Sequence, residues 1–364
     1  MKKKIKVLLP CLLLFILVTG GGCEKKEAAD DYLGRLITRA KETEGELSGV
    51  LEDGISDVKE TEDLVVDFPE ELKVSYEEFL KDALKQVQFE LNKAEETGDH
   101  TYSVRVTYEP IDIAVTTESA NLEYAENIAS ADFCAEVEAL LEQDRAMLES
   151  AEKQQKKSRT ITVTKSGDKF SIDEEEMKEL LKDSLQGYMD PYAAVADVFD
   201  MRDFIQAYLD ASLKGETARY QEHTGLSDEE AAAWYEDSFS EFKMDELSEE
   251  QNARLKNAAK GIFKSCQYTV GATKQVSLTE YIFDITITPN TSFLSVMSEF
   301  EGGTYYSESE AKEAFLTLYD KYASAPSYGE ETTITVTWNA MNMMNVWQEN
   351  EEYDLLMDTI VPME

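Results

Sequence analysis

Hydrophobic and polar positions follow the same pattern in two separate parts of the chain. When the sequence is shifted by 179 residues, residues 85–110 fall on residues 264–289 without a gap. Each part is predicted to hold the end of a helix, a strand, a short polar turn and a second strand that proline closes. Alternating apolar positions coincide in the second strand: Val104, Val106 and Tyr108 fall on Phe283, Ile285 and Ile287.

The elements on either side of the two predicted hairpins also correspond. A helical stripe precedes each hairpin, and another follows it, as in residues 133–148 and 311–322. Residues 160–164 and 333–337 both read Thr-Ile-Thr-Val-Thr, a β-branched run that favours a strand. A closing helix is predicted after each run, around Leu180 and Leu355.

This repeated order predicts an α+β fold of two tandem related domains. Each domain is expected to contain helices and a small antiparallel sheet, in the order helix–hairpin–helix–strand–helix. We expect the first domain to cover residues 32–190 and the second to cover residues 198–364. Residues 188–197, which contain Pro191, are interpreted as the linker between them. The chain of 364 residues is long enough for two cores of this kind.

The N-terminus has the pattern of an export signal. Residues 1–22 have four lysines among their first six residues, followed by an apolar run over residues 7–18. This run is shorter than the ~20 residues that span a bilayer, so residues 1–22 are predicted to be a signal peptide. Residues 23–31 are small and charged and are interpreted as a tether.

The end of this signal resembles the lipobox of bacterial lipoproteins, in which small residues stand directly before a cysteine. Gly21, Gly22 and Cys23 fit that motif, whereas Gly20 stands where the family usually has an aliphatic residue, which leaves ordinary secretion as the alternative. The tandem unit behind a lipobox resembles uncharacterised Gram-positive lipoproteins built from repeated domains of unknown function. The resemblance implies that Cys23 carries a diacylglycerol, which anchors the protein to the outer face of the cell membrane. It implies no catalytic residue.

The charge of the chain restricts its partners. The formal net charge of the whole chain is −40. The part that follows the signal is more negative still, because the lysines of residues 1–22 do not belong to it. Such a surface repels phosphate backbones, so we expect no binding to nucleic acid. An envelope protein or a cationic ligand remains a possible partner.

Candidate catalytic and metal-binding residues are few. The two histidines, His100 and His223, fall at non-equivalent positions and are predicted to lie in solvated loops. No motif for zinc hydrolysis, serine hydrolysis, phosphate cradling or calcium binding occurs in the sequence. We therefore expect no cofactor and assign no metal site.

Three further groups have both a structural and a functional interpretation. Cys134 and Cys266 are interpreted as unpaired residues, with a disulfide between them as the alternative. The methionines at 341, 343 and 344 are interpreted as core residues, with soft copper binding as the alternative. Tyrosines at 305, 306, 319, 322 and 328 could line a carbohydrate or peptide surface, but the spacing over residues 315–322 favours a packed helix face.

Two classes of function follow. The favoured one is a non-catalytic binding or scaffolding lipoprotein at the cell envelope, because duplication of a domain without a catalytic constellation enlarges a surface or forms a cleft. The alternative is a ligand receptor or enzyme with a pocket between helices and sheet. Two filled cores favour the first class, and a deep pocket with converging polar groups favours the second.

Overall fold

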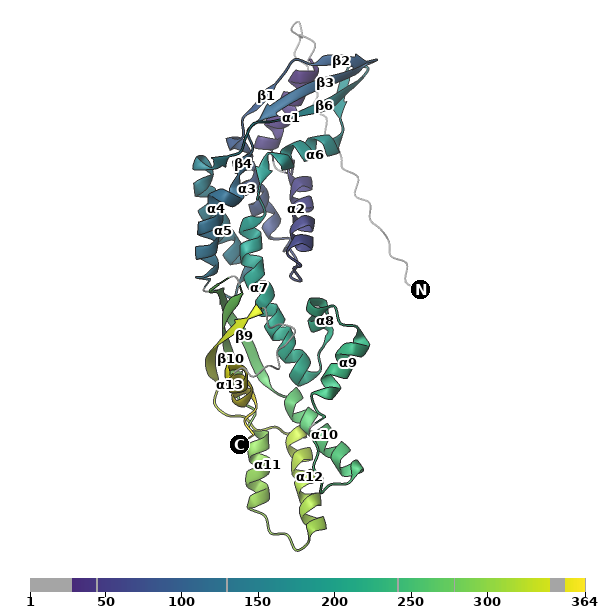
Figure 1. Cartoon of the computed structure of the whole chain (residues 1–364), viewed down its shortest axis with the longest axis vertical. Coiled ribbons are helices and arrows are strands. Elements are labelled where there is room, and N and C mark those ends of the chain that lie inside the picture. The colour runs from purple at the N-terminus through teal and green to yellow at the C-terminus, as the bar shows by residue number, and fades with distance from the viewer. Residues whose placement is uncertain are drawn as a thin grey trace.

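The protein has an α+β fold, as the sequence predicts. The computed structural model describes residues 28–43, 45–128, 130–240, 242–277, 279–340 and 351–363. Within these residues, helices and small, mostly antiparallel sheets follow one another along an elongated molecule (Figure 1). A five-stranded sheet lies toward one end, and a helical hairpin forms the other end.

The first half of the chain forms the end that carries the five-stranded sheet. Its helices are α1 (Ala29–Glu42), α2 (Ser48–Thr61), α3 (Leu72–Gln86), α4 (Ile113–Ala125), α5 (Phe133–Met147), the short helix η1 (Leu148–Ser150) and α6 (Glu174–Asp183). Its strands are β1 (Phe89–Leu91), β2 (Glu95–Gly98), β3 (Thr101–Tyr108), β4 (Ile111–Asp112), β5 (Glu152–Lys153), β6 (Lys157–Ser166), β7 (Lys169–Ile172) and β8 (Leu185–Gln186). The order in the larger sheet is β1-β3-β6-β7, with β2 also paired to β3, and a small sheet has the order β5-β4-β8. Because α1 begins at Ala29, the last three residues of the predicted tether are helical.

In the described residues of the second half there is one three-stranded antiparallel sheet, together with a larger share of helix. Its helices are α7 (Asp190–Leu209), the π-helical segment η2 (Asp210–Lys214), α8 (Ala218–Thr224), α9 (Asp228–Asp237), α10 (Glu249–Lys264), α11 (Ser292–Glu301), α12 (Glu308–Ser324) and α13 (Glu351–Ile360). Its strands are β9 (Gln267–Gln275), β10 (Glu280–Thr288) and β11 (Thr332–Asn339), in the order β11-β10-β9.

Both predicted hairpins are present, and the Thr-Ile-Thr-Val-Thr run pairs with the hairpin in each. In the first half Val104 on β3 lies opposite Ile161 on β6. In the second half the corresponding residue, Phe283 on β10, lies opposite Val336 on β11 and not opposite Ile334. The pairing therefore differs by two residues between the halves. A two-residue difference keeps the same side chains on the buried face, because side chains alternate along a strand.

The outer strand of each hairpin is irregular at the same aligned position. In the first half the strand is interrupted after Leu91, and the amide of Asn92 donates to the carbonyl of Arg105 at 2.9 Å. In the second half the strand continues, but its register with β10 shifts between Phe283 and Ile285, opposite Gly271. Gly271 is the residue that aligns with Asn92. Both halves thus bend this edge at one place, by a break in one case and by a bulge in the other.

The segment predicted to be a linker, residues 188–197, is instead the beginning of a long buried helix. Gly187 turns the chain with a φ of +68°, and Pro191 stands in the first turn of α7, where proline is favourable. Twelve of the twenty residues of α7 are buried, which is typical of a helix that is apolar on most sides. The linker interpretation is therefore wrong.

Helix α7 connects the cores of the two halves. Its neighbours include α4 and α5 in the first half and β9 in the second half. Most of the buried hydrophobic residues form one continuous cluster, which extends from Ala29 to Val361 and includes α7. The proposed boundaries at residues 190 and 198 therefore fall within one packed helix, and the division into two domains stays a prediction.

Candidate functional site

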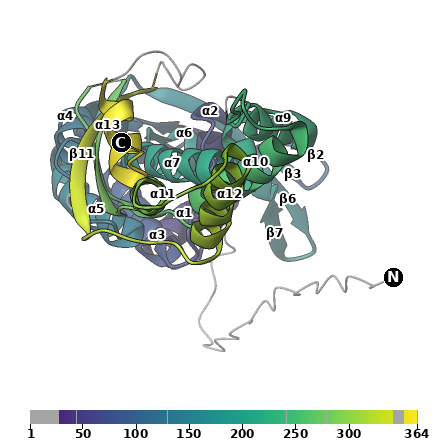
Figure 2. The same cartoon turned by 90° about the horizontal axis from the view of Figure 1, so that it is seen from below.

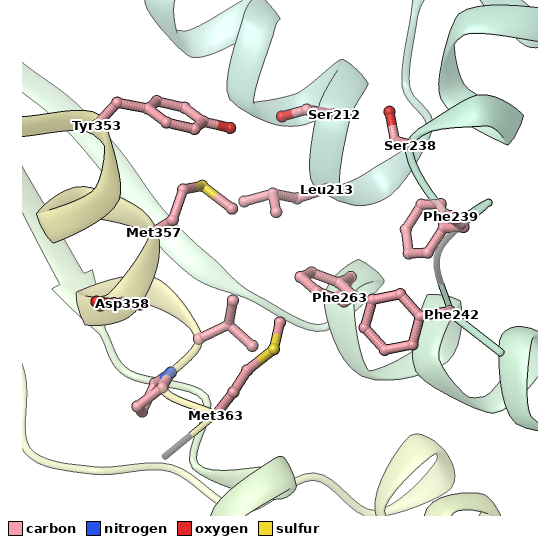
Figure 3. Close-up of a pocket in the computed structure, with 12 residues that line it drawn as sticks. Ser212, Leu213, Ser238, Phe239, Phe242, Phe263, Tyr353, Met357, Asp358 and Met363 are labelled. Carbon is pink, nitrogen blue, oxygen red and sulfur yellow. The ribbon is translucent and has the colours of Figure 1, made fainter. Parts of the chain in front are cut away.

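A cavity lies in the second half of the protein, beyond the end of α7. Its volume is about 570 Å³, within the range of small-molecule sites in proteins. We call it the C-terminal cavity. Its lining comes from η2, the segment after α9, α10, and α13 with the residues that follow it (Figure 3). The lining residues are Ser212, Leu213, Ser238, Phe239, Phe242, Phe263, Tyr353, Met357, Asp358, Val361, Pro362 and Met363.

The π-helical segment η2 supplies one wall of the C-terminal cavity. It continues α7 for five residues with wider turns, a feature that is frequent at functional sites in proteins. The segment ends at Gly215, which has a φ of +73°. A Cβ atom at Gly215 would come within 2.9 Å of the Tyr235 ring, so glycine is required by both backbone and space. Because η2 ends at Gly215, Ser212 and Leu213 lie in its last turn, where they line the cavity.

Three phenylalanine rings form a second wall. The rings of Phe239 and Phe242 both meet Phe263 edge to face, with centroids 5.4 Å and 5.7 Å from it. Phe293 on α11 packs behind them, 5.5 Å from Phe263. Edge-to-face contacts of this kind hold rings in a defined orientation. The aromatic wall is thus supported by neighbouring rings and does not depend on a ligand for its shape.

Helix α13 supplies the third wall. Met357 reaches toward Leu213 across the cavity, and Tyr353 lies at the same side (Figure 3). The hydroxyl of Tyr208 on α7 donates to the hydroxyl of Tyr353 at 3.3 Å. Burial raises the pKa of Tyr353, so this side chain stays neutral at physiological pH.

The polar groups of the lining do not converge on one point. Ser212 donates its hydroxyl hydrogen to the carbonyl of Leu209 at 3.2 Å, and Ser238 donates to the carbonyl of Trp234 at 3.1 Å. Asp358 is exposed at the rim. Eight of the twelve lining residues are apolar. The C-terminal cavity is therefore suited to an apolar ligand, since it offers little to orient or activate a polar one.

The two histidines lie outside this cavity, and one of them is not where the sequence predicts. His100 lies in an exposed turn with a φ of +56°, as expected. His223 lies in α8 with its side chain only 2% exposed. Its Nε2 atom is 2.8 Å from Asp203 and its Nδ1 atom is 3.6 Å from Asp200. The prediction of a solvated loop is wrong for His223, because two carboxylates on α7 compensate for its burial.

The surroundings of His223 indicate a structural role. Asp200 accepts hydrogen bonds at 2.8 Å from the amides of Val65 and Val66, which precede α3. Burial tends to raise the pKa of Asp203, but hydrogen bonds from His223 and Arg219 outweigh that effect and hold it below its usual range. The interactions of Asp200, Asp203 and His223 hold α8 and the segment before α3 against α7. These interactions therefore join parts of both halves.

Other predicted groups fall into three sets. Cys134 and Cys266 are both free thiols, so the alternative of a disulfide is not realised, and Cys266 is buried as predicted. The tyrosines at 319 and 322 pack on α12 as predicted, whereas Tyr306 is 88% exposed. Cys23 and the methionines at 341, 343 and 344 lie outside the described residues.

Across the described residues, no group of three or more His, Cys, Asp or Glu side chains is placed to hold a metal ion. None of the helices in these ranges is long and apolar enough to cross a membrane.

A buried carboxyl on α5 is a further group that the sequence analysis does not single out. Asp144 is 0% exposed, and neither of its carboxyl oxygens has a hydrogen-bond partner. Burial, and next the charge of Asp190, raise the pKa of Asp144 to about 7. Helical spacing from Leu140, Leu141 and Leu148 places residue 144 on the apolar face of the predicted helix, which is the signal that identifies it.

Comparisons with known proteins give little further information. No model of a known protein family matches the chain, and no curated protein matches it. A solved structure that resembles it is described as a "putative lipoprotein (ycdA)" from Bacillus subtilis. The two chains are 13% identical, with a TM-score of 0.35, over 76% of this chain and 96% of the other. A likeness of this size supports no argument about fold or function.

Proposed function

We propose that the protein is a lipid-anchored extracytoplasmic lipoprotein that binds an apolar ligand in the C-terminal cavity. The observation that carries the ligand proposal is a cavity of about 570 Å³ with a mainly apolar lining, whose two serine hydroxyls are already bonded to helix carbonyls. A ligand there gains free energy mainly by removing hydrocarbon from water, at about 25 cal/mol per Å². A hydrocarbon chain is the chemistry that matches this lining.

The anchoring proposal rests on the signal at residues 1–22 and on Cys23. Helix α1 begins six residues after Cys23, so the tether spans at most about 20 Å. The anchored end is therefore close to the first half. The C-terminal cavity lies beyond α7, whose 20 residues alone span about 30 Å. This arrangement favours a ligand that comes from outside the membrane over the protein's own acyl chains.

The ligand proposal is tested by titrating the full chain with a fluorescent fatty acid. Met357→Gln places an amide in the apolar lining, and we expect it to weaken binding by about tenfold or more, because burial of an unpaired amide costs about 1–3 kcal/mol. Met177→Gln is the matched control, since Met177 is also a partly buried methionine, on α6 in the other half. Equal affinities of the two variants, or no binding of the fatty acid to the unmodified chain, would refute the proposal.

The anchoring proposal has a separate test. We expect the unmodified chain to incorporate labelled fatty acid in a lipoprotein-competent bacterium and to enter the detergent phase on partition. Cys23→Ser removes the thiol that accepts the lipid, so this variant should carry no label and should remain unprocessed or be released. Equal labelling of both proteins would exclude Cys23 as the site.

A further inference from the structure

A second apolar surface lies at the end of the molecule formed by α11 and α12, far from α1 (Figure 1). Seen from below, this helical hairpin stands beside α10 (Figure 2). Leu247, Leu255 and Leu316 form a small core of their own there, separate from the main core. Phe315 and Tyr319 pack against both cores, and Tyr319 also contacts Phe293, the ring behind the aromatic wall of the C-terminal cavity.

A groove is open on the surface of this small core. It has a volume of about 370 Å³, and its apolar lining includes Met244, Leu247, Met297, Phe300 and Phe315. We call it the distal groove. Met244 and Met297 are each 40% exposed, although both side chains are hydrophobic. Methionine is flexible and polarizable, and it is frequent on surfaces that accept varied apolar partners.

Aromatic contacts hold the floor of the distal groove in place. Phe300 stacks on Tyr305 with ring centroids 4.9 Å apart, and it meets Phe315 edge to face at 5.2 Å. The hydroxyl of Tyr305 also donates to the backbone carbonyl of Phe300 at 2.8 Å. The floor is therefore formed before any partner binds, which reduces the entropy lost on binding.

The segments that carry the distal groove are strongly acidic. Residues 243–250 and 297–313 contain nine carboxylates and two lysines, and two of these carboxylates, Glu299 and Glu313, pair with Lys321 and Arg254 from outside the ranges. One of those lysines, Lys312, is paired with Glu308 at the groove itself. Glu246, which also lines the groove, is exposed. An apolar floor with an acidic rim is complementary to a segment that has an apolar face and basic flanks.

We infer that the distal groove docks a basic amphipathic helix of a partner protein. The groove lies between helices, so the helix-in-groove mode applies, in which residues at i, i+3, i+4 and i+7 of the partner enter the apolar floor. The lysines or arginines of the partner helix then face the acidic rim of the groove. A second copy of this chain would bring the same acidic rim, and a phosphate-bearing surface would bring negative charge, so repulsion opposes both.

The probe for this inference is a synthetic four-turn peptide of leucine and lysine with leucines at i, i+3, i+4 and i+7. A peptide of the same composition, scrambled so that its leucines do not share a face, is the control. We expect the full chain to bind the amphipathic peptide and to lose affinity as salt is raised, because screening weakens exposed charge pairs. Equal binding of the scrambled peptide would overturn the inference.

Variants localise the binding to the groove. Met244→Gln together with Met297→Gln keeps the charge of the protein and removes two apolar contacts, so we expect the affinity to fall by about tenfold or more. Val74→Gln together with Leu355→Gln is the matched control, because these residues are also exposed and hydrophobic, at 67% and 58%, and lie outside the groove. Unchanged affinity in the groove variant would refute the inference. Concentration-dependent dimers of the unmodified chain that the groove variant abolishes would also refute it, because a second copy would then be the occupant.

Discussion

The buried carboxyl of Asp144 predicts a dependence of stability on pH. In the unfolded chain an aspartate has a pKa of about 3.9, whereas burial, and then the charge of Asp190, raise the pKa of Asp144 to about 7 in the folded protein. The folded state therefore binds more protons between these two values. The stability that the protonated side chain contributes is fully present below about pH 4 and is lost as the pH rises through about 7.

The size of this effect follows from the two pKa values. Their difference corresponds to about 4 kcal/mol in the free energy of unfolding between low and high pH. Measurements are best made away from the isoelectric point of about 4.3. Between pH 5.5 and pH 8.5 roughly 2 kcal/mol of the effect remains, because about half of it is already lost at pH 5.5.

Asp144→Asn removes this titration while nearly preserving the volume of the side chain. The buried amide has its own cost of about 1–3 kcal/mol, but that cost does not change with pH. We therefore expect the stability of the variant relative to the unmodified protein to increase by roughly 2 kcal/mol from pH 5.5 to pH 8.5. Urea unfolding followed by circular dichroism at both pH values measures the difference.

An exposed carboxyl close to Asp144 provides the control. Glu149→Gln removes one negative charge from the surface just beyond the end of α5, so it reports the general effect of net charge. We expect its relative stability to be nearly the same at the two pH values. The reasoning would be refuted if the free energy of unfolding of Asp144→Asn relative to the unmodified protein were also the same at both pH values. Asp144 would then be ionised or solvated in the folded state.

Two further predictions concern the packing of the two halves. Tyr281 is 2% exposed and its hydroxyl donates to Asp197 on α7, whereas Tyr102 is only partly buried. Tyr281→Ala should therefore lower the free energy of unfolding by about 3–5 kcal/mol, and Tyr102→Ala should lower it by clearly less. Urea unfolding of both variants measures this, and equal losses would contradict the difference in burial. Residues 188–197 should resist limited proteolysis, because they are helical and largely buried. Mass spectrometry of the first fragments would contradict this if the earliest cut fell in that range.

Alternation along the strands was sufficient to predict the hairpins, but not their pairing. The pattern at Val104 and Phe283 shows which face of each strand is buried, and both residues are buried. It does not show which residue of the neighbouring strand lies opposite, because a shift of the pairing by two positions leaves the same side chains on the buried face. Phe283 accordingly pairs with Val336, whereas its counterpart Val104 pairs with Ile161, the residue that aligns with Ile334.

The C-terminal cavity could not be predicted from the sequence for a related reason. Leu213, Phe263 and Met357 belong to segments that are far apart in the chain, and each reads as an ordinary core position. Whether such residues fill the space between their helices depends on the angles and distances of packing, which periodicity does not contain. Asp144 differs, because a carboxyl within an apolar helical stripe is visible in the sequence itself.

Helix α7 shows how two halves with a similar order of elements can share one continuous core. A proline between two similar sequence patterns is typical of a linker, and Pro191 lies at such a place. The same proline is compatible with the first turn of a helix, and the residues after it, from Tyr192 to Leu209, are apolar on most sides. A helix of that kind is stable only when it is buried on most sides, so each half must supply part of its surroundings. Any change that separates the halves would therefore expose the apolar surface of α7 to water.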